Sequence, residues 1–373
     1  ILKTSSYERW TGSVALNPSF LNDHLTINFN AKGMLSHTQY AQTGAIGQAT
    51  SMDPTKPVKV SAEEDPTGMY KNAFNGYFQY HTPVTDRNDP YWQYGINTLS
   101  PRNPKSTLNE GEDRGTGKEL TGNIEIDYKI HGLEDLHLHA NLGGDFKWGE
   151  SNKEYSRYNY DNYYYGSKGW NTQRTYNLSL NAYAQYMKEL KNHYIDVMAG
   201  YEWQRFNLKS DYFYQGTYPM KNTKNPGEPY NPSTNTLYKT ENYLVSFFGR
   251  INYTALNRYM LTFTMRADGS SRFAKNKRWG YFPSAAIAWR VNEEPFLRDS
   301  KVVNDFKIRA GWGMTGQQEG IADYYYIPTY QTMNNGAYYP IYGSGATARP
   351  QVYNTNLTWE KTTTYNVGID MGF

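Results

Sequence analysis

Apolar and polar side chains alternate along much of this chain, often for ten or more residues at a time. Between residues 8 and 20, Trp10 and Val14 alternate with polar residues such as Thr11 and Ser13. A period of two residues places successive side chains on opposite faces of a β-strand. Because strands of globular domains are usually about 5–6 residues long, longer alternation is typical of the wall of a transmembrane β-barrel. The pattern therefore predicts an all-β, antiparallel transmembrane barrel wall.

Eleven segments carry this alternation, and the connections between them differ in length. The segments are 8–20, 24–36, 119–131, 136–149, 174–188, 194–208, 241–254, 258–272, 279–292, 304–316 and 359–373. Short turns join them in pairs, whereas most of the intervening connections are long, at about 37–118, 150–173, 209–240 and 317–358. Outer-membrane barrels have short periplasmic turns and long extracellular loops. We therefore expect the following residues on the periplasmic side: Asn22, Glu134, Asn192, Asn257 and Pro295.

The connection 37–118 is too long for a simple connector and is rich in proline and glycine. A loop of that length is usually functional or disordered. Within it, residues 41–52 could form one short helix.

One face of the best-patterned segments, such as 119–131 and 258–272, carries no charged residue. A lipid-facing arginine at the bilayer midplane costs roughly 2–4 kcal/mol, so we expect this face to meet lipid. The residues predicted there are Ile126, Leu138, Leu180, Val197, Phe247, Leu261 and Ile308. Arginine at Leu261 should accordingly destabilise the wall far more than arginine at Thr262, which belongs to the lumen side.

The bulk composition narrows the possible classes of protein. Lys and Arg number 38 against 35 Asp and Glu, and no basic tract is present, so nucleic acid is not an expected partner. The mean hydropathy of −0.82 is compatible with a barrel, because only every second wall residue meets lipid. No stretch approaches the ~20 apolar residues of a membrane helix. The absence of cysteine excludes a disulfide framework.

The region from 245 to 373 carries longer motifs. It reads RYMLTFTMRADGSSRF at 258–273, RWGYFPSAAIAWR at 278–290, FKIRAGWGMTGQ at 306–317 and LTWEKTTTYNVGID at 357–370. This region closely resembles the barrel of the SusC/RagA family of TonB-dependent outer-membrane transporters. Residues 127–129 and 133–136 resemble the same family more weakly.

The resemblance implies a barrel of about 22 strands, an N-terminal plug, a TonB-contacting segment and a SusD-like surface lipoprotein that acts as a lid. The eleven segments amount to half of such a barrel, and neither the plug nor the TonB-contacting segment is recognisable here. The chain also begins at Ile1 without a signal peptide. We therefore expect residues 1–373 to be a partial barrel domain, excised from a longer protein. Its sheet should be open, with edges at 8–20 and 359–373, and should aggregate or fail to insert alone.

Aromatic residues are unusually frequent, with 37 Tyr, 15 Phe and 9 Trp, and many fall in the predicted outer loops. Exposed aromatic side chains can stack on sugar rings or grip peptide side chains. They can equally pack the loops together and contact a lid. The ligand-binding candidates are Trp92, Tyr163, Tyr164, Tyr165, Tyr214, Tyr325, Tyr326 and Tyr330.

Charged residues recur on the predicted lumen face. They include Arg250, Arg266, Asp268, Arg290, Lys307 and Arg309. Unpaired charges are costly to bury, so these residues should pair with a plug or guide a polar solute, and ion pairs are more often structural. His137 with His139, and the acidic residues Glu110, Glu112 and Asp113, could suggest metal ligands, but polar or solvated faces explain them more simply. We expect no catalytic residue, metal or cofactor.

These observations favour a non-enzymatic part of an outer-membrane nutrient importer that contacts outer-membrane lipid. The solute would be an oligosaccharide or, as the less favoured choice, an oligopeptide, captured beneath a SusD-like lid and released when TonB remodels the plug. A secreted glycan-binding β-sandwich and a surface glycosidase remain alternatives. A glycosidase needs two carboxylates about 5–10 Å apart, which a sequence does not locate. A requirement for detergent would separate the barrel from both.

Overall fold

The computed structural model describes residues 2, 4–83, 94–97, 99–159, 166–216, 234–298, 300, 302–332 and 348–372. One large antiparallel sheet dominates them, in the strand order β1-β3-β6-β7-β8-β9-β10-β11-β12-β13-β16, with β2 paired to β3. Its strands are β1 (Ser6–Leu16), β2 (Ser19–Phe20), β3 (Leu25–Gln39), β6 (Gly111–Ile130), β7 (Leu133–Tyr155), β8 (Ser167–Leu190), β9 (His193–Gly216), β10 (Thr234–Ala255), β11 (Tyr259–Ser270), β12 (Trp279–Arg290), β13 (Asp305–Gln317) and β16 (Glu360–Gly372). The eleven predicted strands are therefore confirmed in order, and the two-residue β2 is added.

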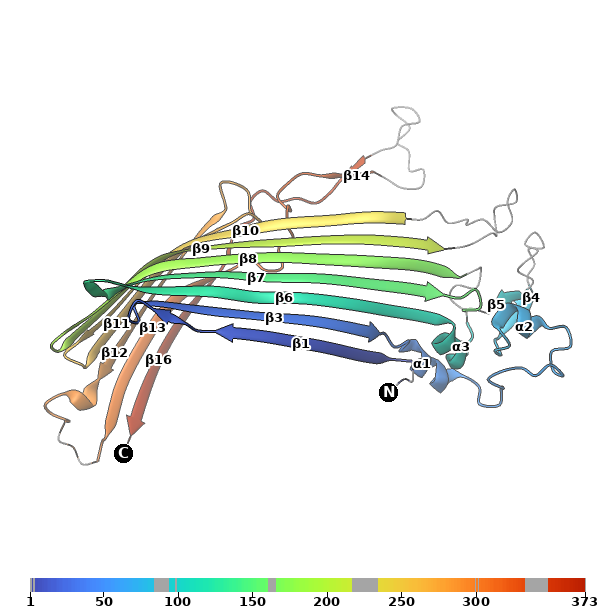
Figure 1. Cartoon of the computed structure of the whole chain (residues 1–373), viewed down its shortest axis with the longest axis horizontal. Helices are drawn as coiled ribbons and strands as arrows, with labels where there is room; N and C mark the ends of the chain where they lie inside the picture. Colours follow the sequence, from blue (N-terminus) through green and yellow to red (C-terminus); the bar gives the residue numbers. More distant parts are fainter. Residues whose placement is uncertain are drawn as a thin grey trace.

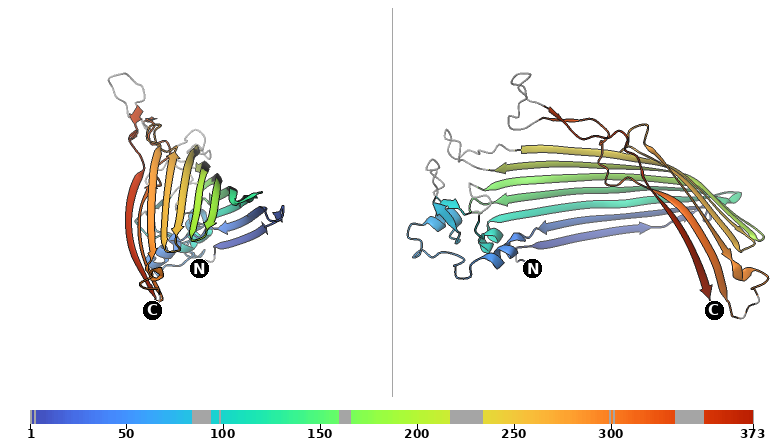
Figure 2. Two further views of the ribbon diagram at one scale, coloured as in Figure 1. Left: turned by 90° about the vertical axis from the view of Figure 1, so that its left-hand side faces the viewer. Right: turned by 180° about the vertical axis from the view of Figure 1, so that it is seen from behind.

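The sheet is a curved wall rather than a closed ring. Figure 1 shows β1, β3 and β6 to β10 running side by side, with β11, β12, β13 and β16 continuing the sheet at an angle. In Figure 2 the wall is twisted, and β1 and β16 form its two edges in the described part of the chain. The expected open sheet is confirmed.

Five strands are much longer than the sequence predicts. Strands β6 to β10 contain 20, 23, 24, 24 and 22 residues. The predicted loops at 150–173 and 209–240 are therefore partly wrong, because paired strand continues into both from either end, over 150–155, 167–173, 209–216 and 234–240. Beyond the membrane both faces of a strand meet water, so the alternation fades while the backbone hydrogen bonds persist.

The cross-strand register gives the sheet one apolar and one polar face. Ile126 pairs with Ala140, and the same row continues through Ala182 and Tyr201 to Phe247. Directly paired residues share a face, and the register places all seven predicted lipid-facing residues on this one. Phe247 is 52% exposed and Leu261 is 45% exposed, as expected of side chains that cover the outside of the wall.

Two aromatic girdles bound the apolar face. Near the short turns lie Tyr128, Tyr186, Tyr253, Tyr259 and Trp289, and toward the opposite ends lie Trp148, Tyr176, Trp203, Tyr243 and Trp279. On β10, Tyr243 and Tyr253 are ten positions apart. With a rise of ~3.4 Å per residue and a strand tilt of ~40°, that spacing corresponds to about 25 Å, the usual height of an outer-membrane apolar band.

The short turns that join β1 to β3, β6 to β7, β8 to β9, β10 to β11 and β12 to β13 lie at one end of the wall (Figure 1). The turn from β10 to β11 uses Leu256 and Asn257 at positive φ, 51° and 55°. The turn from β12 to β13 contains the 3-10 helix η2 (Val291–Glu293) and the buried Glu294. Glu294 accepts hydrogen bonds from Arg258, Tyr259 and Trp289 at 2.7, 2.5 and 3.0 Å. Led by the Tyr259 hydroxyl, these donors hold the pKa of Glu294 below its ordinary value.

The connection between β3 and β6 is a small folded unit in its described parts. It contains α1 (Gly44–Ser51), α2 (Met69–Phe74), β4 (His81–Pro83), β5 (Tyr94–Ile96) and α3 (Pro104–Asn109), so the short helix expected within 41–52 is confirmed. The 2%-exposed Asn103 caps α3 and donates to the carbonyls of Val58 and Phe78 at 2.9 and 3.0 Å. The remaining short strands are β14 (Tyr330–Thr332) and β15 (Ala348–Pro350). No helix among the described residues is long and apolar enough to cross a membrane.

Candidate ligand-binding site

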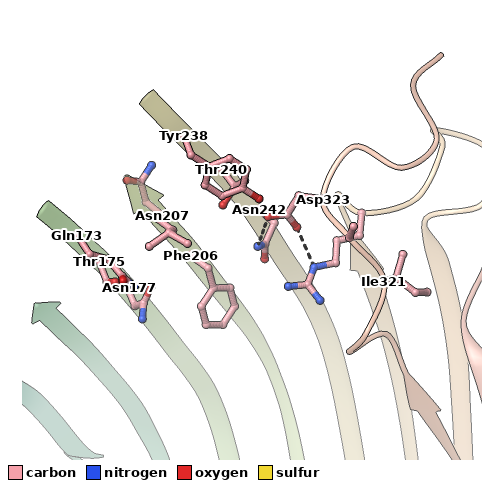
Figure 3. A pocket seen from close by; sticks show the side chains of 13 residues that line it. Gln173, Thr175, Asn177, Phe206, Asn207, Tyr238, Thr240, Asn242, Ile321 and Asp323 are labelled. Carbon is pink, nitrogen blue, oxygen red and sulfur yellow. Dashed lines mark hydrogen bonds and ion pairs between the residues drawn. The ribbon is translucent and has the colours of Figure 1, made fainter. Parts of the chain in front are cut away.

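A pocket of about 440 Å³ lies on the polar face of the sheet, in the outer halves of β8, β9 and β10 (Figure 3). Its lining consists of Gln173, Thr175, Asn177, Phe206, Asn207, Leu208, Tyr238, Thr240, Asn242, Arg272, Ile321, Ala322 and Asp323. Most of these side chains are amides, hydroxyls or aromatic rings. The pocket is therefore a polar depression with aromatic surface.

The β-sheet register brings the polar side chains together. Asn177 of β8 pairs with Phe206 of β9, and Phe206 pairs with Asn242 of β10. Two residues farther out, Thr175, Leu208 and Thr240 form the next row. Because the side chains alternate between faces, every second residue of three neighbouring strands points into the pocket.

A segment that follows β13 closes the pocket on its fourth side. Asp323 accepts hydrogen bonds from the Arg272 Nε at 3.0 Å and from the Asn242 Nδ2 at 3.3 Å, as Figure 3 shows. The Tyr324 hydroxyl contacts the backbone of Glu241, at 3.1 Å from its N–H and 3.0 Å from its carbonyl. The segment is thus joined to β10 at two successive residues.

A buried aromatic cluster anchors the same segment. Phe273, Phe282 and Trp359 are at most 7% exposed and pack together with Ile321. The Trp359 indole donates to the Arg278 carbonyl at 2.8 Å. Gly316 is required beside this cluster, because a Cβ there would lie 2.1 Å from the Phe282 ring. The glycine provides space for packing rather than a ligand site.

The chemistry of the pocket suits a neutral, hydroxyl-rich ligand. Asn177, Gln173 and Thr175 offer both donors and acceptors. The Arg272 and Asp323 charges pair with each other, so neither presents an uncompensated charge. Phe206 and Tyr238 add ring surface on which a sugar ring can stack.

A second depression extends the polar path toward the turns. It measures about 370 Å³ and shares Asn177 and Phe206 with the first. Farther along, Arg266 contacts Glu202, Asp268 and Ser246 at 2.7, 2.7 and 2.9 Å. These contacts compensate the guanidinium charge, which is the structural role that the sequence favours for ion pairs.

All six predicted lumen-facing residues lie on the polar face by register, although they do not form one cluster. Arg266 and Asp268 belong to the network just described. Arg250 donates to the Thr264 hydroxyl at 3.3 Å. Lys307 and Arg309 pair with Asp370 at 3.7 and 3.3 Å, and Arg290 is exposed near the turns. Whether these residues bind a plug or a solute stays a prediction.

None of the predicted ligand-binding aromatic residues that the structure describes lines the pocket. Trp92, Tyr163, Tyr164 and Tyr165 lie outside the described residues. Tyr214 is farther out on the polar face of β9, and Tyr325, Tyr326 and Tyr330 follow the segment that closes the pocket. Sequence reasoning missed Phe206 and Tyr238 as ligand candidates. Phe206 lies within the predicted segment 194–208 as an aromatic residue on its polar face, and Tyr238 continues the alternation of β10 past the predicted start at 241; these are the signals that would have found them.

The residues that suggested metal sites have protein partners. Glu110 accepts hydrogen bonds from Asn75 and Ser156 at 2.9 and 2.5 Å, and Asp113 pairs with Lys153 at 3.1 Å. His137 lies 3.1 Å from Asp127. These contacts explain the polar residues without a metal.

Comparisons with known proteins agree with the barrel architecture. Residues 60–373 match the family described as TonB dependent receptor-like, beta-barrel. The TonB-dependent receptor SusC of Bacteroides thetaiotaomicron is 46% identical over 375 residues, covering 100% of this chain and 36% of SusC. The TonB-dependent receptor P3 of Formosa agariphila is 31% identical over 215 residues, covering 55% of this chain and 20% of P3.

Among solved structures, the RagAB peptide importer in its closed-closed state has a similar fold. The TM-score is 0.70 at 19% identity, with 99% of this chain and 38% of that chain covered. The chain thus spans little more than a third of the length of SusC and of this structural relative.

Proposed function

Because this chain belongs to the TonB-dependent receptor-like β-barrel family, we propose that the whole protein imports a nutrient across the outer membrane. The wall lies in the outer membrane, with its apolar face toward lipid. The polar face would then line the passage, and residues 1–373 would supply about half of the barrel. The barrel itself would bind and release the solute without breaking a covalent bond.

We propose that the imported solute is an oligosaccharide. The observation that carries this proposal is the pocket between β8, β9 and β10, whose amides and hydroxyls surround Phe206 and Tyr238. Neutral sugars need many donors and acceptors and a flat apolar surface, but no uncompensated charge. Because Arg272 pairs with Asp323, neither of these two charges in the pocket is uncompensated.

An oligopeptide is the second candidate. The fold likeness to the RagAB peptide importer motivates it, although a likeness at 19% identity concerns the fold alone. Within the pocket, Arg272 and Asp323 would have to separate to bind the ends of a peptide. Their 3.0 Å contact therefore favours the neutral ligand.

The proposed import cycle also needs partners. Energy would come from TonB acting on a plug, as the family resemblance implies. A SusD-like surface lipoprotein would cover the mouth of the barrel, and the exposed rings of Tyr325 and Tyr330, 37% and 70% exposed, are candidates for contact with it. The predicted aromatic residues Trp92 and Tyr163–Tyr165 remain candidates for ligand contact at the same mouth.

Binding measurements on the full-length, detergent-purified protein test the substrate proposal. We would titrate neutral oligosaccharides and uncharged or zwitterionic oligopeptides of similar size by calorimetry. Phe206→Ala and Tyr238→Ala should each weaken oligosaccharide binding roughly tenfold, since aromatic contacts contribute about 0.5–1.5 kcal/mol beyond burial. Leu237→Ala is the matched control, because Leu237 adjoins Tyr238 but points to the opposite face.

Equal effects of Tyr238→Ala and Leu237→Ala would contradict this assignment of the site. Binding of peptides but not of sugars, with both pocket variants impaired, would replace the oligosaccharide by the second candidate. Hydrolysis of a glycan by the purified protein would instead favour a surface glycosidase.

A further inference from the structure

Basic residues from neighbouring strands lie side by side on the apolar face, at the outer edge of the outer aromatic girdle. Lys118 of β6 pairs with Trp148 of β7, and Trp148 pairs with Arg174 of β8. The same row continues to Lys209 of β9 and Lys239 of β10. Because directly paired residues share a face, all five side chains point outward with the lipid-facing residues.

A groove of about 530 Å³ runs along the first part of this row. It is lined by Thr116, Lys118, Trp148, Gly149, Glu150, Thr172 and Arg174. The Trp148 indole donates to the Tyr176 hydroxyl at 3.1 Å, and the two rings meet edge to face at 6.0 Å. These contacts fix an aromatic surface between the exposed Lys118 and Arg174 side chains.

The row has little internal compensation for its charge. Among the residues that the structure describes, Lys118, Arg174, Lys209 and Lys239 form no ion pair. The one carboxylate of the groove, Glu150, accepts a hydrogen bond from the Asn152 side chain at 2.8 Å. Directly opposed like charges, such as Arg174 and Lys209, destabilise an antiparallel pair. An external anion would relieve this repulsion.

The surface on the membrane side of the row is apolar. Leu120, 47% exposed, follows Lys118 by two positions on the same face, and Phe146 pairs with it across β7. Leu142 continues the same surface and is 52% exposed. A ligand that fits both the basic row and this apolar surface has an anionic head and hydrocarbon chains. A free anion would leave the apolar surface uncovered and is therefore not the best occupant.

We propose that this groove binds a phosphorylated glycolipid of the outer leaflet. The phosphate would lie between Lys118 and Arg174, with the sugar over Trp148 and the acyl chains against Leu120 and Phe146. Thr116 and Thr172 would donate further hydrogen bonds to the phosphate. This site is on the opposite face of the wall from the ligand pocket, so it is separate from the proposed import function. It rests on the location of the wall in the outer membrane and on the outward orientation of the strand ends opposite the short turns.

The test compares two double variants of the full-length protein in detergent. Lys118→Gln with Arg174→Gln removes two charges from the groove. Lys32→Gln with Lys147→Gln removes two charges from the polar face and is the matched control. Folding of each variant is checked by its mobility shift on heating in gels. Binding of a bis-phosphorylated lipid A is then measured by native mass spectrometry, alongside its dephosphorylated form and inorganic phosphate.

The groove variant should bind the phosphorylated lipid roughly thirtyfold more weakly than wild type, from about 1 kcal/mol for each basic residue near an anionic surface. The control variant should bind like wild type. Equal binding by the two double variants would overturn the proposal. So would equal binding of the phosphorylated and dephosphorylated lipids, or equally tight binding of inorganic phosphate.

Discussion

The assignment of faces makes a sharp prediction at neighbouring residues of β11. Phe263 is 43% exposed on the apolar face, between Ile251 of β10 and Ala285 of β12. It lies four positions from Tyr259 of the inner girdle and six from Gly269, which pairs with Trp279 of the outer girdle. Phe263 is therefore near the middle of the apolar band, so Phe263→Arg should cost about 2–4 kcal/mol more than Phe263→Ala.

Thr262 is the matched position on the polar face. Its hydroxyl donates to the Asn252 side chain at 2.9 Å, and Asn252 in turn donates to Asp196 at 3.0 Å. Arginine there loses about 1 kcal/mol of hydrogen bonding but gains a nearby carboxylate, so Thr262→Arg should differ little from Thr262→Ala. The cost of Leu261→Arg should fall between those of Phe263→Arg and Thr262→Arg. Leu261 is only two positions from Tyr259, so a long arginine side chain there can reach the membrane interface.

Denaturant titrations of the full-length protein in lipid vesicles would measure these differences. The folded fraction is followed by heat-sensitive gel mobility and by tryptophan fluorescence, so that two probes report the same transition. A shift of 2–4 kcal/mol is large beside the usual 5–15 kcal/mol of a folded domain, and is readily resolved. A cost at Thr262 equal to or above that at Phe263 would refute the assignment of faces.

Three further predictions concern the turns and the pocket. Glu294→Gln should loosen the turn between β12 and β13. Because the pKa of Glu294 is held below its ordinary value of 4.5, the carboxylate stabilises the wild type above that pH, and melting curves should show this advantage fading as the pH falls below it. Gly316→Ala should force the Phe282 ring to move and weaken ligand binding, whereas Gly12→Ala, with no atom within 4 Å, should leave calorimetric affinity unchanged. Asp323→Asn should release the segment that closes the pocket, detected as faster hydrogen exchange at 321–324, while Glu319→Gln should have no such effect.

The strand pattern was predictable from the sequence because alternation is a local property. In β3 and β11 the apolar residues of one face are separated mostly by polar residues, and both strands lie where the sequence places them. The outer halves of β8 and β9 were missed, since beyond the membrane the outward face also carries charged residues such as Arg174 and Lys209. There the strands are held by backbone hydrogen bonds, which do not require alternating apolar side chains, so the sequence shows no two-residue hydrophobic pattern.

The pocket was less predictable, because its residues come together only through register and long-range packing. Phe206 and Asn242 are neighbours by the pairing of β9 with β10, which the alternation does not specify. Arg272 and Asp323 are 51 residues apart and meet through the segment that Phe282 and Trp359 anchor. Sequence reasoning placed charged residues on the polar face, but it had no means of pairing them.

The length of strands β8, β9 and β10 bears on the entropy of ligand capture. Nine of the thirteen lining residues, from Gln173 to Asn242, lie on ladder-paired backbone rather than on loops. Folding has already removed the backbone freedom of such residues, at about 1–2 kcal/mol each. A solute that contacts these nine residues therefore orders only their side chains, and substitution of those side chains can change the selectivity of the pocket without reorganising the surrounding chain.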